Sequence, residues 1–322
     1  MQGATLDAIG LGPLETPHTV AHTESGVALR RYEGAASGPI VLIVPAPIKR
    51  PYVWDIAPDV SVVRRCLAGG ARIFLIDWQL APPHFGLADY AGRLIADCLD
   101  AAGGERAILL GHSLGGLFAA IFSAAYPERV RGLALLASPL NFGPDARVFS
   151  RMAAALDVED LPDLLPGSFL GIASLNAAPG TFGWERWADG ALSFADASAL
   201  RLHMQVERWS LDEFPLPRRL VADLLAPIVR ENRFARGTLE IDGRSASPSR
   251  LTARLLCVID AHCAVVPPET VLPVFEAAGS GNKTLLHYER EPGVSLQHVG
   301  PLVGPRAHAS LWPRIVRWMQ AH

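Results

Sequence analysis

One short segment carries a spacing of glycine and serine that is typical of a serine nucleophile. Gly111, Ser113 and Gly115 form a G-x-S-x-G pattern between an apolar run, residues 107–110, and a helix-like run, residues 117–126. A strand, a tight turn and a helix in this order form a nucleophile elbow. Glycine is needed on both sides of the serine because a side chain would collide with the neighbouring strand or helix. The segment therefore predicts acyl transfer through the Oγ atom of Ser113.

A histidine near the C-terminus is the predicted base for this serine. A serine hydroxyl is a weak nucleophile and needs a base within hydrogen-bonding reach. In elbow-type sites the chain order is serine, acid, histidine. His298 follows the last predicted strand, residues 284–288, and precedes a terminal helix that ends near Trp318. His308 is the alternative, but its position indicates the start of that helix, so we predict that His298 is the base.

Short apolar runs that end at turn residues must position these groups. Such runs occupy residues 40–44, 73–76, 108–110, 133–136, 255–259 and 284–288. Uninterrupted apolar strands that alternate with helices indicate an α/β architecture with a parallel sheet buried on both faces. Residues 26–32 are expected to add an antiparallel edge strand at the start.

The alternation stops over residues 141–237, a stretch rich in Leu, Ala, Asp, Pro and Trp that is typical of short helices. A loop of this length without structure of its own would be unusual. We predict an inserted cap that covers the substrate, because the stretch leaves the sheet near the strand ends where such sheets bind ligands. The alternative is a separate domain with no role at the site. The predicted division is a core in two parts, residues 1–140 and 238–322, with the cap between them.

The bulk properties exclude several classes of function. The chain has 322 residues, 50% of them hydrophobic and 19% charged, with a net charge of −3. No basic block suggests nucleic acid or an anionic membrane surface. The four cysteines lack metal-binding spacing, so we expect no metal or other cofactor. The N-terminal residues do not resemble a signal peptide, and no membrane span is expected, so the predicted location is the cytoplasm.

Several further segments resemble the polyhydroxyalkanoate synthases. They are residues 44–55 and 74–78, residues 206–212 and 231–237 in the predicted cap, and residues 297–300 and 311–315 around the predicted base. The resemblance runs from about residue 40 to residue 320 and implies an α/β-hydrolase fold with an inserted helical cap. It also implies hydroxyacyl substrates, as esters, oligoesters or acyl-CoA, and allows homo-oligomers or association with polyester granules.

The nucleophile departs from this family. The synthases carry a cysteine where this chain has Ser113. A thiolate is more nucleophilic than a neutral hydroxyl and departs more readily when the acyl chain is passed on. Serine is the nucleophile of esterases, lipases and the related intracellular polyester depolymerases. The exchange therefore favours hydrolysis over polymerisation.

The triad acid is displaced as well. In the segment that resembles the family's acid loop, Cys263 occupies the position of the aspartate, four residues before Pro267. Asp260 lies three residues earlier, at the end of a predicted strand. Three outcomes follow: Asp260 orients His298 from a shifted position, the serine and histidine work without an acid, or activity is lost. Asp260 would otherwise cap a turn.

The oxyanion hole is the third departure. One donor is expected to be the backbone N–H of Leu114, directly after the nucleophile. The resemblance places Pro47 at the second donor position, and proline has no N–H. Ile48, or Ala46, would have to replace it.

These residues predict a serine hydrolase, of esterase, thioesterase or polyester depolymerase type, that acts on hydroxyacyl esters through an acyl-enzyme on Ser113. One alternative is a synthase-like acyltransferase that uses hydroxyacyl-CoA. The other is a degenerate relative that binds a granule, a synthase subunit or a ligand without catalysis.

Overall fold

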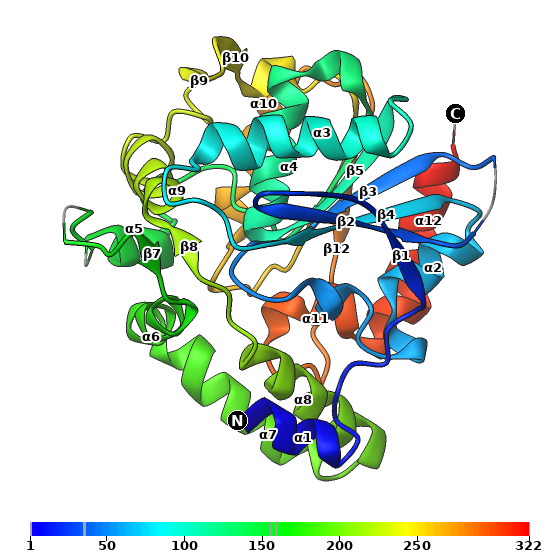
Figure 1. The fold of residues 1–322 in the computed structure, drawn as a ribbon. Helices are drawn as coiled ribbons and strands as arrows, with labels where there is room; N and C mark the ends of the chain where they lie inside the picture. The colour runs from blue at the N-terminus through cyan, green and yellow to red at the C-terminus, as the bar shows by residue number, and fades with distance from the viewer. Residues whose placement is uncertain (1, 35–36, 155, 159, 322) are drawn as a thin grey trace.

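A mostly parallel sheet forms the centre of the protein (Figure 1). The structure is a computed structural model that describes residues 2–34, 37–154, 156–158 and 160–321. Across the described sheet the strands are β1 (His18–Glu24), β2 (Val27–Tyr32), β4 (Arg72–Trp78), β3 (Ile40–Val44), β5 (Ala107–His112), β6 (Val130–Leu136), β11 (Arg254–Ile259) and β12 (Lys283–His287). The β1–β2 and β2–β4 pairs are antiparallel and the rest are parallel. The predicted α/β fold is confirmed.

The strands are apolar on both sides because helices cover both faces of the sheet. In β3 every residue is buried. Leu42 and Val44 belong to the core beneath α3 (Leu94–Ala101) and α4 (Ser113–Ala125). Val41 and Ile43 belong to the core beneath two helices on the opposite face. Those helices are α2 (Val62–Ala68) and α12 (Trp312–Gln320), as Figure 1 shows. Two cores therefore fix the central strands whose ends carry the site.

The remaining elements of the core are short. They are α1 (Gln2–Ala8), α10 (Leu272–Ala277), α11 (Gly300–Val303), the pair β9 (Leu239–Ile241) and β10 (Arg244–Ala246), and the single turns η1 (Pro51–Trp54), η2 (Pro58–Val60), η3 (Asp89–Arg93), η4 (Pro127–Arg129), η7 (Pro248–Arg250), η8 (Pro268–Thr270), η9 (Gln297–Val299) and η10 (Ala307–Leu311).

The start of the sheet differs from the sequence prediction. Residues 26–32 do contain an antiparallel strand, β2, but β2 pairs with β1 on one side and with β4 on the other. The edge strand is therefore β1. Its sequence, HTVAHTE, is polar and mostly accessible to solvent, so it lacks the apolar run from which the other strands could be predicted.

Residues 141–237 form mainly short helices between β6 and the β9–β10 pair, and we refer to them as the helical segment. Its elements are α5 (Arg147–Ala154), β7 (Leu164–Leu165), α6 (Gly167–Ala177), η5 (Gly180–Trp184), α7 (Glu185–Ser193), α8 (Ala197–Ser210), β8 (Leu216–Pro217), α9 (Arg218–Asp223) and η6 (Leu224–Arg230). In Figure 1 they lie to the left of the sheet and below it. The N-terminal helix is tied to this segment because Asp7 forms an ion pair with Arg208 of α8.

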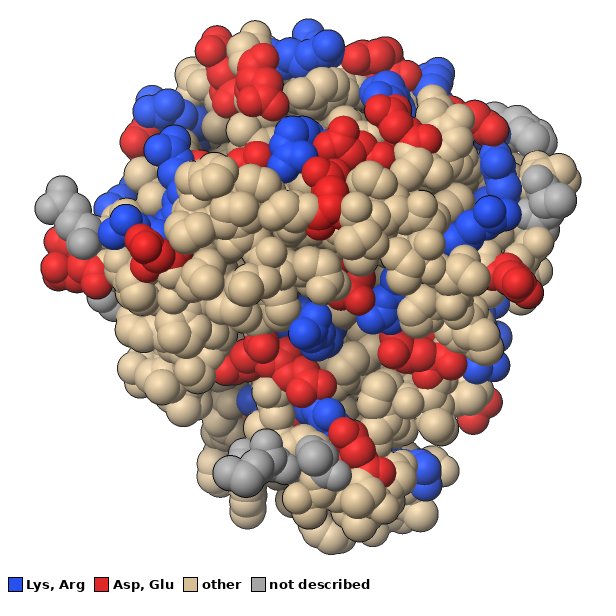
Figure 2. Space-filling model, in the orientation of Figure 1, with Lys and Arg blue, Asp and Glu red and all other residues tan. Residues whose placement is uncertain are grey.

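Charges of both signs are mixed over the face of the molecule shown in Figure 2. Ion pairs also join charged residues of different elements, as between Arg93 and Glu24 and between Arg244 and Glu128. A mixed surface of this kind does not create the single-sign field that attracts nucleic acid. None of the helices in the described ranges is long and apolar enough to cross a membrane.

Candidate active site

Ser113 lies at the junction of β5 and α4 in a backbone conformation that few residues adopt. Its φ angle is +54°, in the left-handed region that side chains normally avoid. Two glycines permit the turn. A Cβ on Gly111 would lie 2.5 Å from Cα of Gly116, and a Cβ on Gly115 would lie 2.1 Å from the carbonyl oxygen of Val44. The turn therefore has the close packing of a nucleophile elbow and presents Oγ at the end of the sheet.

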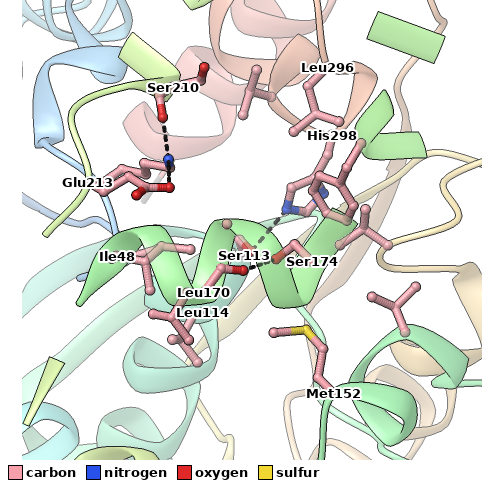
Figure 3. Close-up of a pocket in the computed structure, with 18 of the residues that line it drawn as sticks. Ile48, Ser113, Leu114, Met152, Leu170, Ser174, Ser210, Glu213, Leu296 and His298 are labelled. Atoms are coloured by element: carbon pink, nitrogen blue, oxygen red, sulfur yellow. Dashed lines mark hydrogen bonds and ion pairs between the residues drawn. The ribbon is translucent and has the colours of Figure 1, made fainter. Parts of the chain in front are cut away.

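The imidazole of His298 lies within hydrogen-bonding distance of the Ser113 hydroxyl. Its Nε2 atom lies 2.9 Å from Oγ of Ser113, and the two side chains point toward one another in Figure 3. Burial lowers the pKa of His298 well below 6.5, and nearby His112 lowers it further. The imidazole is therefore neutral at physiological pH, and Nε2 can accept the serine proton.

His112, the residue before the nucleophile, contacts both the backbone and the ring of His298. Its Nε2 atom is 2.8 Å from the backbone oxygen of His298, and the two rings lie 4.7 Å apart. Burial lowers the pKa of His112 to about 4, so its neutral ring donates one hydrogen bond to that oxygen. His308, the alternative base, is instead buried in the C-terminal helices, where Nε2 lies 2.7 Å from the oxygen of Leu302.

A thiol occupies the third position of the triad. Sγ of Cys263 lies 3.7 Å from Nδ1 of His298 and also accepts the N–H of Val266 at 3.3 Å. Burial raises the pKa of the Cys263 thiol to about 11, so it is neutral at physiological pH. A neutral sulfur accepts the Nδ1 proton only weakly and cannot stabilise an imidazolium as a carboxylate does.

Asp260 does not occupy the position that the orienting role requires. Its carboxylate accepts the N–H of His262 at 2.8 Å and an N–H of Arg290 at 3.0 Å. The N–H of Cys263 bonds to the backbone oxygen of Asp260. Asp260 thus holds the turn after β11, and that turn carries Cys263, rather than Asp260, to His298.

The two expected oxyanion donors lie on elements that meet at Ser113. Leu114 is in the first turn of α4, where backbone N–H groups have no partner within the helix and the helix dipole favours negative charge. Ile48 lies in the loop after β3, and both residues line the cavity at Ser113 (Figure 3). The backbone oxygen of Ile48 accepts the N–H of Phe214. That bond fixes the Ile48 loop to the helical segment.

The cavity above Ser113 has a volume of about 460 Å³ and is mostly apolar. Side chains of the helical segment form much of its wall, among them Phe149, Met152, Leu170, Phe182, Leu225 and Ile228. Its charged residues have partners within the protein. Arg50 lies 3.9 Å from a carboxylate oxygen of Asp77 and over the ring of Phe214. Lys49 donates to Glu213 at 3.0 Å and to the backbone oxygen of Ser210, and Arg186 pairs with Glu207. The cavity therefore suits an uncharged, largely apolar group.

Known proteins are similar to this chain in sequence over most of its length. The family model of the alpha/beta hydrolase fold matches residues 60–166. Poly(3-hydroxyalkanoate) polymerase subunit PhaC of Haloferax mediterranei is 27% identical over 98% of this chain, which spans 65% of that protein. The subunit of the same name from Allochromatium vinosum is 26% identical over 94% of the chain and 88% of the relative. The chain therefore has an α/β-hydrolase fold and is similar in sequence to polyhydroxyalkanoate polymerase subunits.

Solved structures support the α/β-hydrolase fold of this chain. A hydrolase from Pseudomonas aeruginosa superposes with a TM-score of 0.60 over 94% of this chain and 98% of its own, at 18% identity. Together, the fold and the relatives support an enzyme that acts on ester or thioester bonds, as a hydrolase or as an acyltransferase.

Some residues at this site could not be found from the sequence. Lys49 lines the cavity and pairs with Glu213, which is 164 residues away in the chain. Asp189 and Glu207 bind the loop that carries His298. Their partners lie far away in the chain, so no local spacing connects them to the His298 loop. Among the residues that the structure describes, no cluster of three His, Cys, Asp or Glu side chains could hold a metal ion.

Acidification from pH 6.5 to pH 4 is expected to destabilise the fold through its buried histidines. Burial lowers the pKa of His308 to about 4, whereas an unfolded histidine titrates near 6.5. Between these values the unfolded state binds more protons, so the free energy of unfolding falls as the pH falls. For His308 the loss is about 3 kcal/mol, at roughly 1.4 kcal/mol per pKa unit.

Urea denaturation at pH 7, 5.5 and 4.5 measures this effect. The His308→Gln variant, which retains an N–H donor but does not titrate, is expected to lose less stability over that range than the wild type. Equal losses in the two proteins would contradict the assignment.

Proposed function

We propose that this protein is a serine hydrolase that cleaves hydroxyacyl esters or thioesters through an acyl-enzyme on Ser113. The observation that carries the proposal is the 2.9 Å contact between Oγ of Ser113 and the neutral Nε2 of His298. The contact lies at the floor of a largely apolar cavity, next to the first turn of α4.

In the first half of the reaction, His298 removes the hydroxyl proton while Oγ attacks the carbonyl carbon of the substrate. Negative charge develops on the carbonyl oxygen, and the N–H of Leu114 stabilises it together with the dipole of α4. The N–H of Ile48 would be the second donor. When the tetrahedral intermediate collapses, His298 returns the proton to the departing alcohol or thiol.

In the second half, His298 takes a proton from water, and the resulting hydroxide attacks the acyl carbon. Collapse releases the free acid, and Oγ recovers its proton. Serine favours this outcome because an oxyester at Ser113 passes its acyl group to a growing chain less readily than a thioester would.

The cavity indicates the class of substrate. Its apolar wall fits an alkyl or polyester chain, and Lys49, Glu213 and Arg186 in that wall are paired with protein groups rather than free to bind a charged substrate. Because side chains of residues 141–237 complete the wall, we propose that the helical segment is a cap over the substrate. The sequence relatives are named as poly(3-hydroxyalkanoate) polymerase subunits. We infer from these names that the substrate contains a hydroxyacyl unit, as an ester, an oligoester or a CoA thioester.

One specific observation favours a second candidate. Relatives of 26–27% identity over nearly the whole chain are named as polymerase subunits, which supports acyl transfer from hydroxyacyl-CoA to a polyester. The thiol of Cys263 in place of a carboxylate supports a third candidate, a protein that binds its ligand without catalysis.

Product analysis separates these readings. Purified protein is given 3-hydroxybutyryl-CoA or a 3-hydroxybutyryl oligoester, and free acid, free CoA and insoluble polymer are measured. The hydrolase is expected to release free acid in proportion to the substrate consumed, without polymer. Polymer formation would establish the acyltransferase, and the absence of any product above the buffer rate would establish the binding protein.

A further inference from the structure

A buried carboxylate of the helical segment holds the loop that carries the base. Asp189 of α7 has only 6% of its surface exposed. One of its oxygens accepts the N–H of Gly293 at 3.0 Å, and the other accepts the N–H of Ser295 at 2.8 Å. His203 of α8 lies 2.8 Å from the second oxygen through its Nδ1 atom and orients the carboxylate. A buried carboxylate that accepts several hydrogen bonds fixes its donors strongly.

The loop needs this support because its backbone is strained. Gly293 has a φ angle of +88° and Ser295 one of +58°, and such a conformation persists in a residue other than glycine only when its surroundings impose it. Glu207 adds a second attachment, since its carboxylate accepts the hydroxyl of Ser295 while Arg186 holds it from the other side. His298 follows Ser295 by three residues, so the position of the loop sets the position of the imidazole.

Helix α8, which carries Glu207, also contacts the loop that carries Ile48, the second expected oxyanion donor. At the end of α8, Nε1 of Trp209 donates to the backbone oxygen of Arg50 at 2.8 Å. Just beyond the helix, Phe214 donates to the oxygen of Ile48 at 3.0 Å. One rigid element therefore contacts both catalytic loops, and those loops come from distant parts of the chain.

We propose that Asp189 is a positioning residue for His298, and that the α7–α8 pair completes the active site by holding the base loop and the Ile48 loop together. The site is then competent only while α7 and α8 are docked against the sheet. The consequence for catalysis rests on the proposed function, whereas the attachment of the loop can be tested without turnover.

The Asp189→Asn variant tests the proposal. An amide retains the size of the carboxylate but replaces one acceptor oxygen by a donor, which opposes a backbone N–H. Hydrogen–deuterium exchange is expected to increase in the peptide that covers residues 292–299, and the NMR signal of the His298 imidazole is expected to shift as its contact with Ser113 loosens. With turnover, kcat is expected to fall about 10²-fold, the effect of a reacting group misplaced by about 1 Å, while KM changes less than threefold.

Two further variants make the result specific. Asp223→Asn is the matched control, because Asp223 lies in the same helical segment and accepts the N–H of Leu87, away from the His298 loop; its kcat and imidazole signal are expected to match the wild type. Glu207→Gln, a milder change at the same loop, is expected to give a smaller loss of kcat than Asp189→Asn.

Each outcome decides a separate question. An Asp189→Asn protein with unchanged exchange and imidazole signal would overturn the proposal, and so would a loosened loop with unchanged kcat. A rise in KM with unchanged kcat would show that Asp189 only holds the cap over the substrate, and would also overturn it. A wild-type protein without turnover would refute the proposed hydrolase, while the exchange and NMR results would still decide whether Asp189 positions His298.

Discussion

The Cys263→Asp variant is expected to hydrolyse esters about 10² to 10⁴ times faster than the wild type. In serine proteases, loss of the acid's charge lowers kcat by about 10⁴, so supplying a carboxylate should recover up to that factor. Sγ lies 3.7 Å from Nδ1 of His298, and an aspartate oxygen extends further from Cβ than sulfur does. The N–H of Val266, which now bonds to Sγ, would stabilise the new carboxylate. The measurement is kcat/KM for a 3-hydroxybutyryl ester.

The pH profile supplies a second readout for this variant. In the wild type, burial keeps the pKa of His298 well below 6.5, so hydrolysis should not decline between pH 8 and pH 6.5. A carboxylate at position 263 favours the imidazolium, and the acid limb of kcat/KM should move to higher pH. Cys263→Asn is the matched control, with the same shape and no charge. An Asp variant no faster than the Asn variant, in protein with native circular dichroism, would show that the third position does not limit the rate.

The fold could be predicted in most respects because its signals are local. Each buried strand, such as residues 40–44, is a continuous apolar run, and both faces of the sheet need such runs. The elbow is equally local, since two glycines next to Ser113 follow from the close approach of Gly115 to β3. β1 gave no such signal because its residues are mostly polar and none of them is buried.

The groups that serve the nucleophile depend on distant contacts. Asp260 and Cys263 are three residues apart, and only the path of the turn after β11 decides which of them reaches His298. That path is set by Arg290, which bonds to the carboxylate of Asp260 from the loop after β12. Asp189 is 104 residues from Gly293 in the chain, so no spacing could connect them. Local patterns therefore predict the nucleophile, whereas tertiary packing determines which residues contact His298 and its loop.

The Ser113→Ala variant is expected to lose all labelling by a fluorophosphonate probe. The factor by which Ser113→Ala lowers kcat should depend on the residue at position 263. Removing the serine of a complete triad costs about 2 × 10⁶ in kcat, and removing the acid alone costs about 3 × 10⁴. A site that already lacks the acid should therefore lose only about 10² when Ser113 is replaced. In the Cys263→Asp background the same replacement should cost about 10⁴ to 10⁶, because the residues of a triad act as a unit.

The comparison of the two backgrounds distinguishes a weak hydrolase from a protein without catalysis. Ser174 is the control serine, since it lines the same cavity and its hydroxyl donates to the backbone oxygen of Leu170; Ser174→Ala should retain labelling. Labelling of Cys263→Asp but not of the wild type would mean that the thiol at position 263 alone makes Ser113 unreactive in an otherwise intact nucleophile elbow. Labelling that survives Ser113→Ala would place the nucleophile elsewhere, and the contact between Ser113 and His298 would then be a structural hydrogen bond.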